Sequence, residues 1–425
     1  MRDHAREDQV TSAAILFTIA LYPAGLATPG MIAILIGLVW RTIGRGWRLS
    51  STAIDLPLAA LALAITASAL ASPWRAEALT TVAYFMLTLL VSVVPVVAYV
   101  KAGPERALGI LMLWTAGGVV AALWGLTQSW ANCFAVLPTV AMGPTANGLG
   151  TTLASASVLA LGLFAGGKME GRPLWIAGIP VVLAGLFATM SRAAWVGLAA
   201  GILVLAIVDS GARMRLALVV AWAFVVAMGS IIALPNLCTG RAAPLRGEGP
   251  PLRPIFAEVR SIGDLQENRN RLVLWRTAVR MFTDQPVLGT GFGTFTLAFK
   301  RYRPPDSPDE EPPTAHNIFL NFAAETGVLG LAAFVGLCAA GLLSTWRWLI
   351  RSPPQSSGRV AAAAVLAGIV TFVVNQLFEG TVLTVHAGFG FLALFALGAA
   401  GERYLAPAPA PCTSTYQAGA ATSGN

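Results

Sequence analysis

The stretch PTAHNIFLNFAAETGVLGLAAF, residues 313–334, decides how this chain is interpreted. Apart from His316 and Glu325 it carries no ionisable side chain, and its apolar character is typical of a helix that crosses a membrane. A membrane span needs roughly 20 predominantly apolar residues. Ionisable groups at membrane depth are rare and tend to be functional, so His316 is the first residue that needs an explanation.

The composition extends this reading to the whole chain. Of its 425 residues, 56% are hydrophobic and 11% are charged, whereas about 25% are charged in soluble proteins. We therefore predict an all-α polytopic membrane protein. A span-length window gives about twelve transmembrane helices, at 10–26, 29–40, 52–71, 77–100, 107–129, 148–166, 173–190, 193–208, 214–234, 314–346, 360–378 and 385–401.

The distribution of Lys and Arg predicts the orientation, because short loops rich in these residues stay cytoplasmic. With the N-terminus inside, fifteen basic residues fall in inside loops and two, Arg75 and Arg192, in short outside loops. The even number of spans then places both termini in the cytoplasm. Residues 1–234 would hold the first nine spans and 314–405 the last three. The apolar run near the N-terminus is predicted to be retained as a span.

Residues 235–313 form one long outside segment, in which the sequence predicts loop, then a helix over 268–282, then a turn over 285–295. The proline- and acid-rich stretch 301–313 cannot continue a helix. The tail, residues 406–425, is of low complexity and is predicted to be disordered.

His316 is predicted to lie in the first turn of its helix, with Thr314 as the N-cap. On a helical wheel it shares a face with Ala323, Gly327 and Gly330. Glycines so spaced in a membrane helix usually allow close packing, and a structural role is favoured for them. A functional role is favoured for His316. Glu325 would lie half a turn away and roughly 13 Å deeper, too far to reach His316, and a structural role is favoured for it.

Arginines of the outside segment form a second pattern. Arg269, Arg276 and Arg280 fall on one side of the predicted helix, as a basic stripe that is more often solvated or faces head groups. Arg271 lies on the opposite, apolar side. There it either meets an anion or acceptor, or snorkels to water.

Arg192 falls in a tight connection, which we expect to consist of Ser191 and Arg192. The planar guanidinium can bind phosphate through two parallel hydrogen bonds, so Arg192 and Arg271 could together hold a pyrophosphate. A head-group anchor is an equally good interpretation of Arg192. Lesser polar candidates, which could line a cavity or pair between helices, are Asn147, Asn375, Gln376, Glu379 and His386.

Other site chemistries have little support. The net charge of +8 is explained by topology better than by nucleic acid, because the basic residues are spread over short loops. The four cysteines have no metal-like spacing, and a disulfide between Cys133 and Cys238 is a minor alternative. The sequence GTGFG lacks the strand and helix of a phosphate-binding loop. We expect no metal and no cofactor.

Three motifs, in this order, resemble the bacterial O-antigen ligase family. MSRAAWVGL (190–198) and RLVLWRTAVRMFTDQPVLGTGFGTF (271–295) are similar to two of its segments. HNIFLNFAAETGVLG (316–330) fits its His-Asn, nine residues, Gly-x-x-Gly pattern. The resemblance covers roughly residues 145–335. One departure is Leu331, where many ligases have Thr, and it bears on the distinction from polymerase relatives.

The resemblance implies a membrane glycosyltransferase of the GT-C class in the bacterial inner membrane. Its activity would be metal-independent, inverting transfer of a polysaccharide from undecaprenyl pyrophosphate to a sugar hydroxyl of lipid A core, at the periplasmic face. His316 would be the general base, and Arg192 and Arg271 would stabilise the leaving pyrophosphate. Further candidate substrate-binding residues are Arg269, Arg276, Arg280, Asn317 and Asn147.

Three alternatives stay open. An O-antigen polymerase would use the same donor with a second lipid-linked glycan as acceptor. A flippase or transporter of lipid-linked glycan would use the same polar residues as a path, although the related halves common in transporters are not evident. A protein-glycosylating relative is less favoured, because such chains tend to have a longer C-terminal region.

Overall fold

The structure is a computed structural model that describes residues 18, 31–32, 34–36, 51–131, 146–169, 171–209, 211, 213–236, 265–305, 307, 311–381 and 385–407. Side chains are left out at 128–131, 227–228, 230–236, 265–268 and 385–387. Cys133, Cys238, the predicted span 10–26 almost entirely, about half of the span 29–40 and the tail from 408 thus lie outside the described residues, as does the side chain of His386.

Helices make up most of the described part of the chain, which contains no strand. The elements are α3 (Asp55–Ala71), α4 (Arg75–Val100), α5 (Pro104–Ala131), α6 (Ala146–Ala165), α7 (Pro173–Ala188), α8 (Arg192–Val208), α9 (Arg213–Asn236), α11 (Leu265–Asp284), α12 (Phe295–Tyr302), α13 (Ile318–Arg351), α14 (Ser357–Gln376), α15 (Val385–Ala400) and the π-helical turn η4 (Gly401–Leu405).

Five of these helices, α4, α5, α6, α13 and α14, are long and apolar enough to cross a membrane. Three more apolar helices, α3, α7 and α8, are shorter than 18 residues. Together with the apolar composition, they indicate an all-helical membrane protein. The count of twelve spans, the orientation and the inside and outside segments stay predictions.

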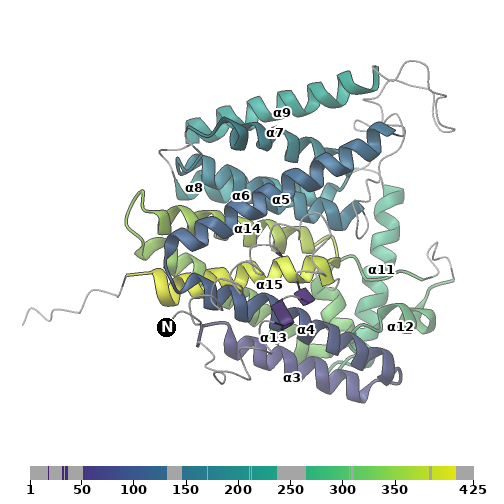
Figure 1. Cartoon of the computed structure of the whole chain (residues 1–425). Helices are drawn as coiled ribbons and strands as arrows, with labels where there is room; N and C mark the ends of the chain where they lie inside the picture. Colours follow the sequence, from purple (N-terminus) through teal and green to yellow (C-terminus); the bar gives the residue numbers. More distant parts are fainter. Residues whose placement is uncertain are drawn as a thin grey trace, which may run out of the picture.

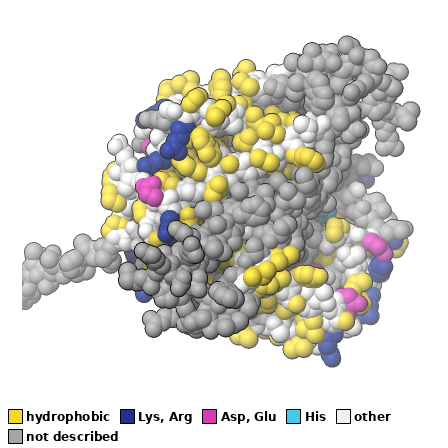
Figure 2. Space-filling view, viewed as in Figure 1, with side chains coloured by type: hydrophobic (Ala, Val, Ile, Leu, Met, Phe, Trp, Pro, Cys, Tyr) yellow, Lys and Arg dark blue, Asp and Glu magenta, His cyan; other side chains and the backbone are white. Residues whose placement is uncertain are grey.

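The apolar helices pack side by side, whereas α11 runs across one end of the bundle with α12 beside it (Figure 1). In the space-filling view, apolar side chains occupy much of the middle of the described surface and Lys and Arg gather towards its two ends (Figure 2). At the centre, α6 is buried along almost its whole length and packs against α8 and α14. Small residues allow this packing: a side chain on Gly162 would collide with Ala364 of α14.

The longest helix, α13, is interrupted at Gly327, whose φ of 63° and ψ of −161° are not helical. The interruption frees backbone groups that must find partners, because nothing in lipid can satisfy them. The segment that follows α11 supplies these partners. Thr290 and Gly291 donate their N–H groups to the carbonyls of Ala324 (3.0 Å) and Glu325 (2.9 Å), and Val328 donates to the carbonyl of Pro286 (2.8 Å).

Glu325 completes this junction from within α13. Its carboxylate accepts the backbone N–H groups of Gly293 (2.9 Å) and Phe295 (2.8 Å), the second of which begins α12. A carboxylate at a helix N-terminus meets free N–H groups and a favourable dipole. The structure thus gives Glu325 a structural role, as favoured from the sequence, and the partners are backbone amides of the glycine-rich turn.

Two expectations about α13 are wrong. The helix begins at Ile318, so His316 precedes it, and the cap is Asn317, whose Oδ1 accepts from the N–H groups of Phe319 and Leu320. Thr314 is therefore not the N-cap. The continuous face from His316 to Gly330 does not exist either, because His316 is outside the helix and Gly327 interrupts it.

We expect Gly327→Ala to lower the free energy of unfolding by about 2 kcal/mol or more. Its backbone conformation is one that essentially only glycine adopts, at a cost of about 1–3 kcal/mol for other residues. An added Cβ would also collide with the backbone of Val287. The matched control is Gly336→Ala in the same helix, where a Cβ would meet nothing within 4 Å. Thermal unfolding in detergent should show a lower Tm for the first variant and an unchanged or higher Tm for the second.

Candidate active site

His316 is held in place by contacts on both sides. Its φ is 48°, a left-handed conformation that is uncommon outside glycine. Its N–H donates to Oγ1 of Thr314 (3.2 Å), and the N–H of Ala315 donates to Oδ1 of Asn321 (2.9 Å). Thr314 packs directly on Gly380, where a Cβ would come within 2.7 Å of its side chain. The segment before α13 is thus fitted against the residues that follow α14.

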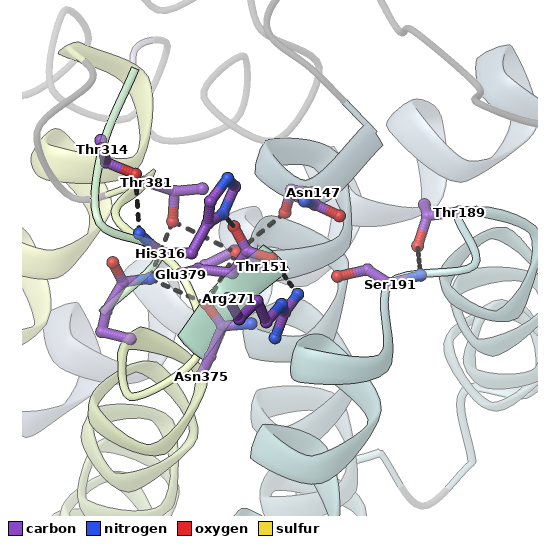
Figure 3. Close-up of polar contacts among 11 residues, drawn as sticks. Asn147, Thr151, Thr189, Ser191, Arg271, Thr314, His316, Asn375, Glu379 and Thr381 are labelled. Carbon is purple, nitrogen blue, oxygen red and sulfur yellow. Dashed lines mark hydrogen bonds and ion pairs between the residues drawn. The ribbon is translucent and has the colours of Figure 1, made fainter. Parts of the chain in front are cut away.

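Glu379 lies in that connection after α14 and brings the two main candidates together (Figure 3). One carboxylate oxygen is 3.3 Å from Nδ1 of His316, and the other is 3.5 Å from Nη2 of Arg271. The Glu379 side chain is 3% exposed, whereas those of His316 and Arg271 are 29% and 26% exposed. Three segments far apart in the sequence therefore converge on one buried carboxylate, with the cationic and basic groups facing outward.

The convergence answers two questions that the sequence left open. Arg271 does lie on the packed side of α11, next to buried Leu274 and Ala278, and it has an anionic partner there. His316 and Arg271 are linked through Glu379, which both contact. Sequence reasoning named Glu379 only among lesser polar residues and did not connect it to either group.

A buried polar layer lies beside Glu379. Thr151 of α6 donates to Oδ1 of Asn375 (2.9 Å), and Gln376 donates to Asn375 (2.8 Å) and to Thr381 (2.7 Å). Within the described residues, Nδ2 of buried Asn375 has no hydrogen-bond partner. These side chains pair between helices, one of the two roles expected for Asn375 and Gln376.

The start of α8 borders the same layer. Ser191 precedes α8 and packs on Gly150, the neighbour of Thr151, at a distance that excludes a Cβ. Its buried Oγ has no partner in the described part of the chain, and Figure 3 draws it on the side that faces the Arg271 group. Arg192 is the first residue of α8 rather than part of the link, which consists of residues 189–191.

The remaining candidates are distributed differently. Asn147, in the first turn of α6, lies beside the group, and its carbonyl accepts a hydrogen bond from Thr151 (2.9 Å). Asn317 uses its side-chain oxygen to cap α13. The stripe of Arg269, Arg276 and Arg280 lies on the exposed side of α11, away from Glu379.

This arrangement suits proton transfer next to a bound anion. An acidic side chain that contacts one ring nitrogen orients a histidine and stabilises the imidazolium that forms when the other nitrogen takes a proton. The guanidinium at the other oxygen adds a fixed positive charge at the same place. Among the residues that the structure describes, no group of three or more His, Cys, Asp or Glu is placed to hold a metal ion.

Comparison with protein-family models gives a match. Residues 177–335 match the family model described as O-Antigen ligase, a region that runs from α7 into α13 and ends before Glu379. A search of curated proteins found no match to the chain. The resemblance of this chain to the O-antigen ligase family is therefore confirmed over the region that carries Arg192, Arg271 and His316.

Proposed function

We propose that this protein is an O-antigen ligase of the bacterial inner membrane. It transfers O-antigen polysaccharide from undecaprenyl pyrophosphate to a sugar hydroxyl of lipid A core at the periplasmic face, with inversion and without a metal. The family match supports an O-antigen ligase- or polymerase-type membrane function. The observation that carries the finer proposal is the placement of His316 and Arg271 on the two oxygens of Glu379.

In the proposed reaction the hydroxyl oxygen of the acceptor attacks the anomeric carbon of the donor sugar. The bond between that carbon and the pyrophosphate oxygen breaks, and its electron pair leaves with the lipid pyrophosphate. Nε2 of a neutral His316 takes the hydroxyl proton. Glu379 accepts from Nδ1–H, so that Nε2 is the nitrogen left with a lone pair, and it balances the charge of the imidazolium. A single displacement of this kind inverts the anomeric configuration.

The leaving pyrophosphate needs positive charge and hydrogen-bond donors. Arg271 supplies a guanidinium whose position is fixed by Glu379. Arg192 begins α8, where the helix dipole also favours an anion. The Oγ of Ser191, which has no partner among the described residues, lies next to it and can donate a further hydrogen bond. We assign Arg192, Arg271 and Ser191 to the pyrophosphate, and Asn147 to the neighbouring part of the substrate.

The exposed basic stripe has a more peripheral place in this proposal. Arg269, Arg276 and Arg280 point away from Glu379, on the side of α11 that anionic head groups or an arriving lipid-linked donor can reach. We assign them to attraction of the donor rather than to the chemical step. Asn317 contributes indirectly, because the cap that it provides fixes the start of α13 next to His316.

A polymerase is the nearest alternative, since it would need the same base and the same pyrophosphate site. Leu331, at a position where many ligases have Thr, keeps this alternative open. A flippase of lipid-linked glycan would use the arginines to bind the donor but would form no glycosidic bond. A base held by a buried carboxylate favours the transferase, because transport has no step that removes a hydroxyl proton.

Replacing His316 tests the general base. His316→Asn is the better variant, because Asn tolerates a left-handed backbone, and His316→Ala is the second. Both should lower turnover by about 10²- to 10⁴-fold, the usual contribution of a positioned base. The assay joins purified lipid-linked polysaccharide to lipid A core in the presence of chelator. Full activity of either folded variant, or activity that requires a divalent cation, would contradict the proposal.

Replacing Arg271 tests the anion site. We expect Arg271→Gln to lower turnover by about 10²-fold or more, because a preorganised donor that stabilises developing charge typically contributes this much. The matched control is Arg75→Gln, an exposed arginine whose Nε donates to the carbonyl of Leu70. The control should stay within about twofold of the parent protein. Equal loss in both variants, measured in the same assay, would remove the special role of Arg271.

Deletion in cells distinguishes ligase from polymerase. Loss of a ligase should leave lipid A core without O-antigen while long polymer accumulates on undecaprenyl pyrophosphate. If single repeats instead remain attached to the core, the protein is a polymerase. Gel analysis of lipopolysaccharide, together with extraction of the lipid-linked glycans, separates the two outcomes and also detects a block in translocation.

A further inference from the structure

A second polar cavity lies at the other end of α13. Its volume is about 600 Å³, and its lining includes Arg347 and Arg351 from the last turns of α13 and Glu402 and Arg403 from η4. Residues 51–53, which precede α3, close another side. The cavity is lined by the last turns of α13, whereas His316 precedes the first residue of that helix. The two sites therefore lie at opposite ends of the bundle.

The cavity carries a surplus of positive charge. Glu402 is the one acidic residue of the described lining, and its Oε1 is 3.5 Å from Nη1 of Arg347 and 3.9 Å from Nη1 of Arg351. Arg403 is the third guanidinium and is exposed. Three guanidinium groups and one carboxylate give the described lining a net charge of +2. Arg347 is 50% exposed, so it can turn towards a ligand without unfolding its helix.

The backbone around the cavity is shaped specifically. Residues 401–405 form a π-helical turn, in which Ala406 donates its N–H to the carbonyl of Gly401 (2.9 Å). π-helical turns are rare in proteins, and many of those that occur lie at functional sites. Gly401 has no room for a side chain because the ring of Trp348 packs on it. The π turn is thus fixed against α13, with Glu402 and Arg403 presented at the cavity.

An apolar face of α13 adjoins the basic cavity. Leu343, Trp346 and Ile350 are about half exposed although they are large and apolar. At 100° per residue, Leu343 and Ile350 lie within about 40° and 60° of Arg347 on the helix. Tryptophan is enriched where a membrane meets water. A ligand with a phosphate group and hydrocarbon chains would match both surfaces, whereas a soluble phosphate would match the cavity alone.

We propose that this cavity binds the head group of an anionic phospholipid, with its acyl chains running past Leu343 towards the middle of α13. Arginines suit its phosphate because they donate paired hydrogen bonds, and basic pockets between membrane helices bind anionic head groups. The lipid comes from the leaflet at this end of the bundle, which the distribution of Lys and Arg predicts to be cytoplasmic. This site is independent of the proposed transferase reaction.

The test compares lipid binding by the full chain and by two variants in detergent. Delipidated protein is titrated with phosphatidylglycerol, phosphatidylcholine or soluble glycerol phosphate, and bound lipid is counted by native mass spectrometry. The variant Arg347→Gln/Arg403→Gln should bind phosphatidylglycerol at least about tenfold more weakly than the parent, because charge-assisted hydrogen bonds to phosphate are lost. The matched control is Arg359→Gln at the same end, whose guanidinium donates to the carbonyl of Leu349 (3.1 Å).

Parent protein and control should bind phosphatidylglycerol alike and prefer it to phosphatidylcholine. Equal affinity of the double variant, or no preference for the anionic lipid, would overturn the proposal. If glycerol phosphate binds as tightly as the lipid, the proposal that the ligand is a membrane lipid is wrong. If the glutamine variant does not give a monodisperse protein, Arg347→Lys/Arg403→Lys replaces it, and it should bind more weakly than the control because lysine cannot form the paired contact.

Discussion

Backbone polar groups inside a membrane bundle must find partners within the protein, and the break in α13 shows how this constraint builds the site. Opening the helix at Gly327 frees two carbonyls and an N–H group, and the segment 286–291 satisfies them. Because this segment directly follows α11, the same hydrogen bonds hold α11 across the bundle end. Arg271 is thereby brought near the start of the helix whose interruption made the docking necessary.

The buried Glu379 imposes a second requirement on the same region. A carboxylate removed from water is costly unless it is paired and hydrogen-bonded. Arg271 supplies the charge and His316 a polar contact, each from a different segment. Losing either partner would leave the buried carboxylate with too few polar contacts. The positions of Arg271 and His316 are therefore tied to the stability of this end of the bundle. Such coupling keeps both groups in a fixed arrangement before any substrate arrives.

The all-helical membrane fold could be predicted from the sequence, because long apolar runs have few alternatives to membrane helices. Local patterns also single out His316 and Arg271 as candidates, an imidazole at a span end and a guanidinium on an apolar helix side. Glu379 was not connected to them, because the link joins residues 63 and 108 positions apart and depends on tertiary packing. The break at Gly327 was missed for a related reason: the glycine pattern is equally compatible with close packing of a straight helix. The sequence favours Thr314 as the N-cap of α13, whereas Asn317 is the N-cap in the structure. The position at which the helix begins depends on how the preceding segment packs, which the local sequence does not show.

The junction between the glycine-rich turn and α13 has a consequence for protein engineering. The turn and the helix meet through main-chain groups. At Gly289 in the turn and Gly327 in α13, any side chain would collide with the backbone of the other segment. A chimera with a crossover between these two glycines would combine a turn and a helix from different proteins, whose backbones need not fit one another. Exchange of the whole stretch from α11 to the end of α13 would preserve the fit, which makes that stretch the natural unit for exchange between related chains.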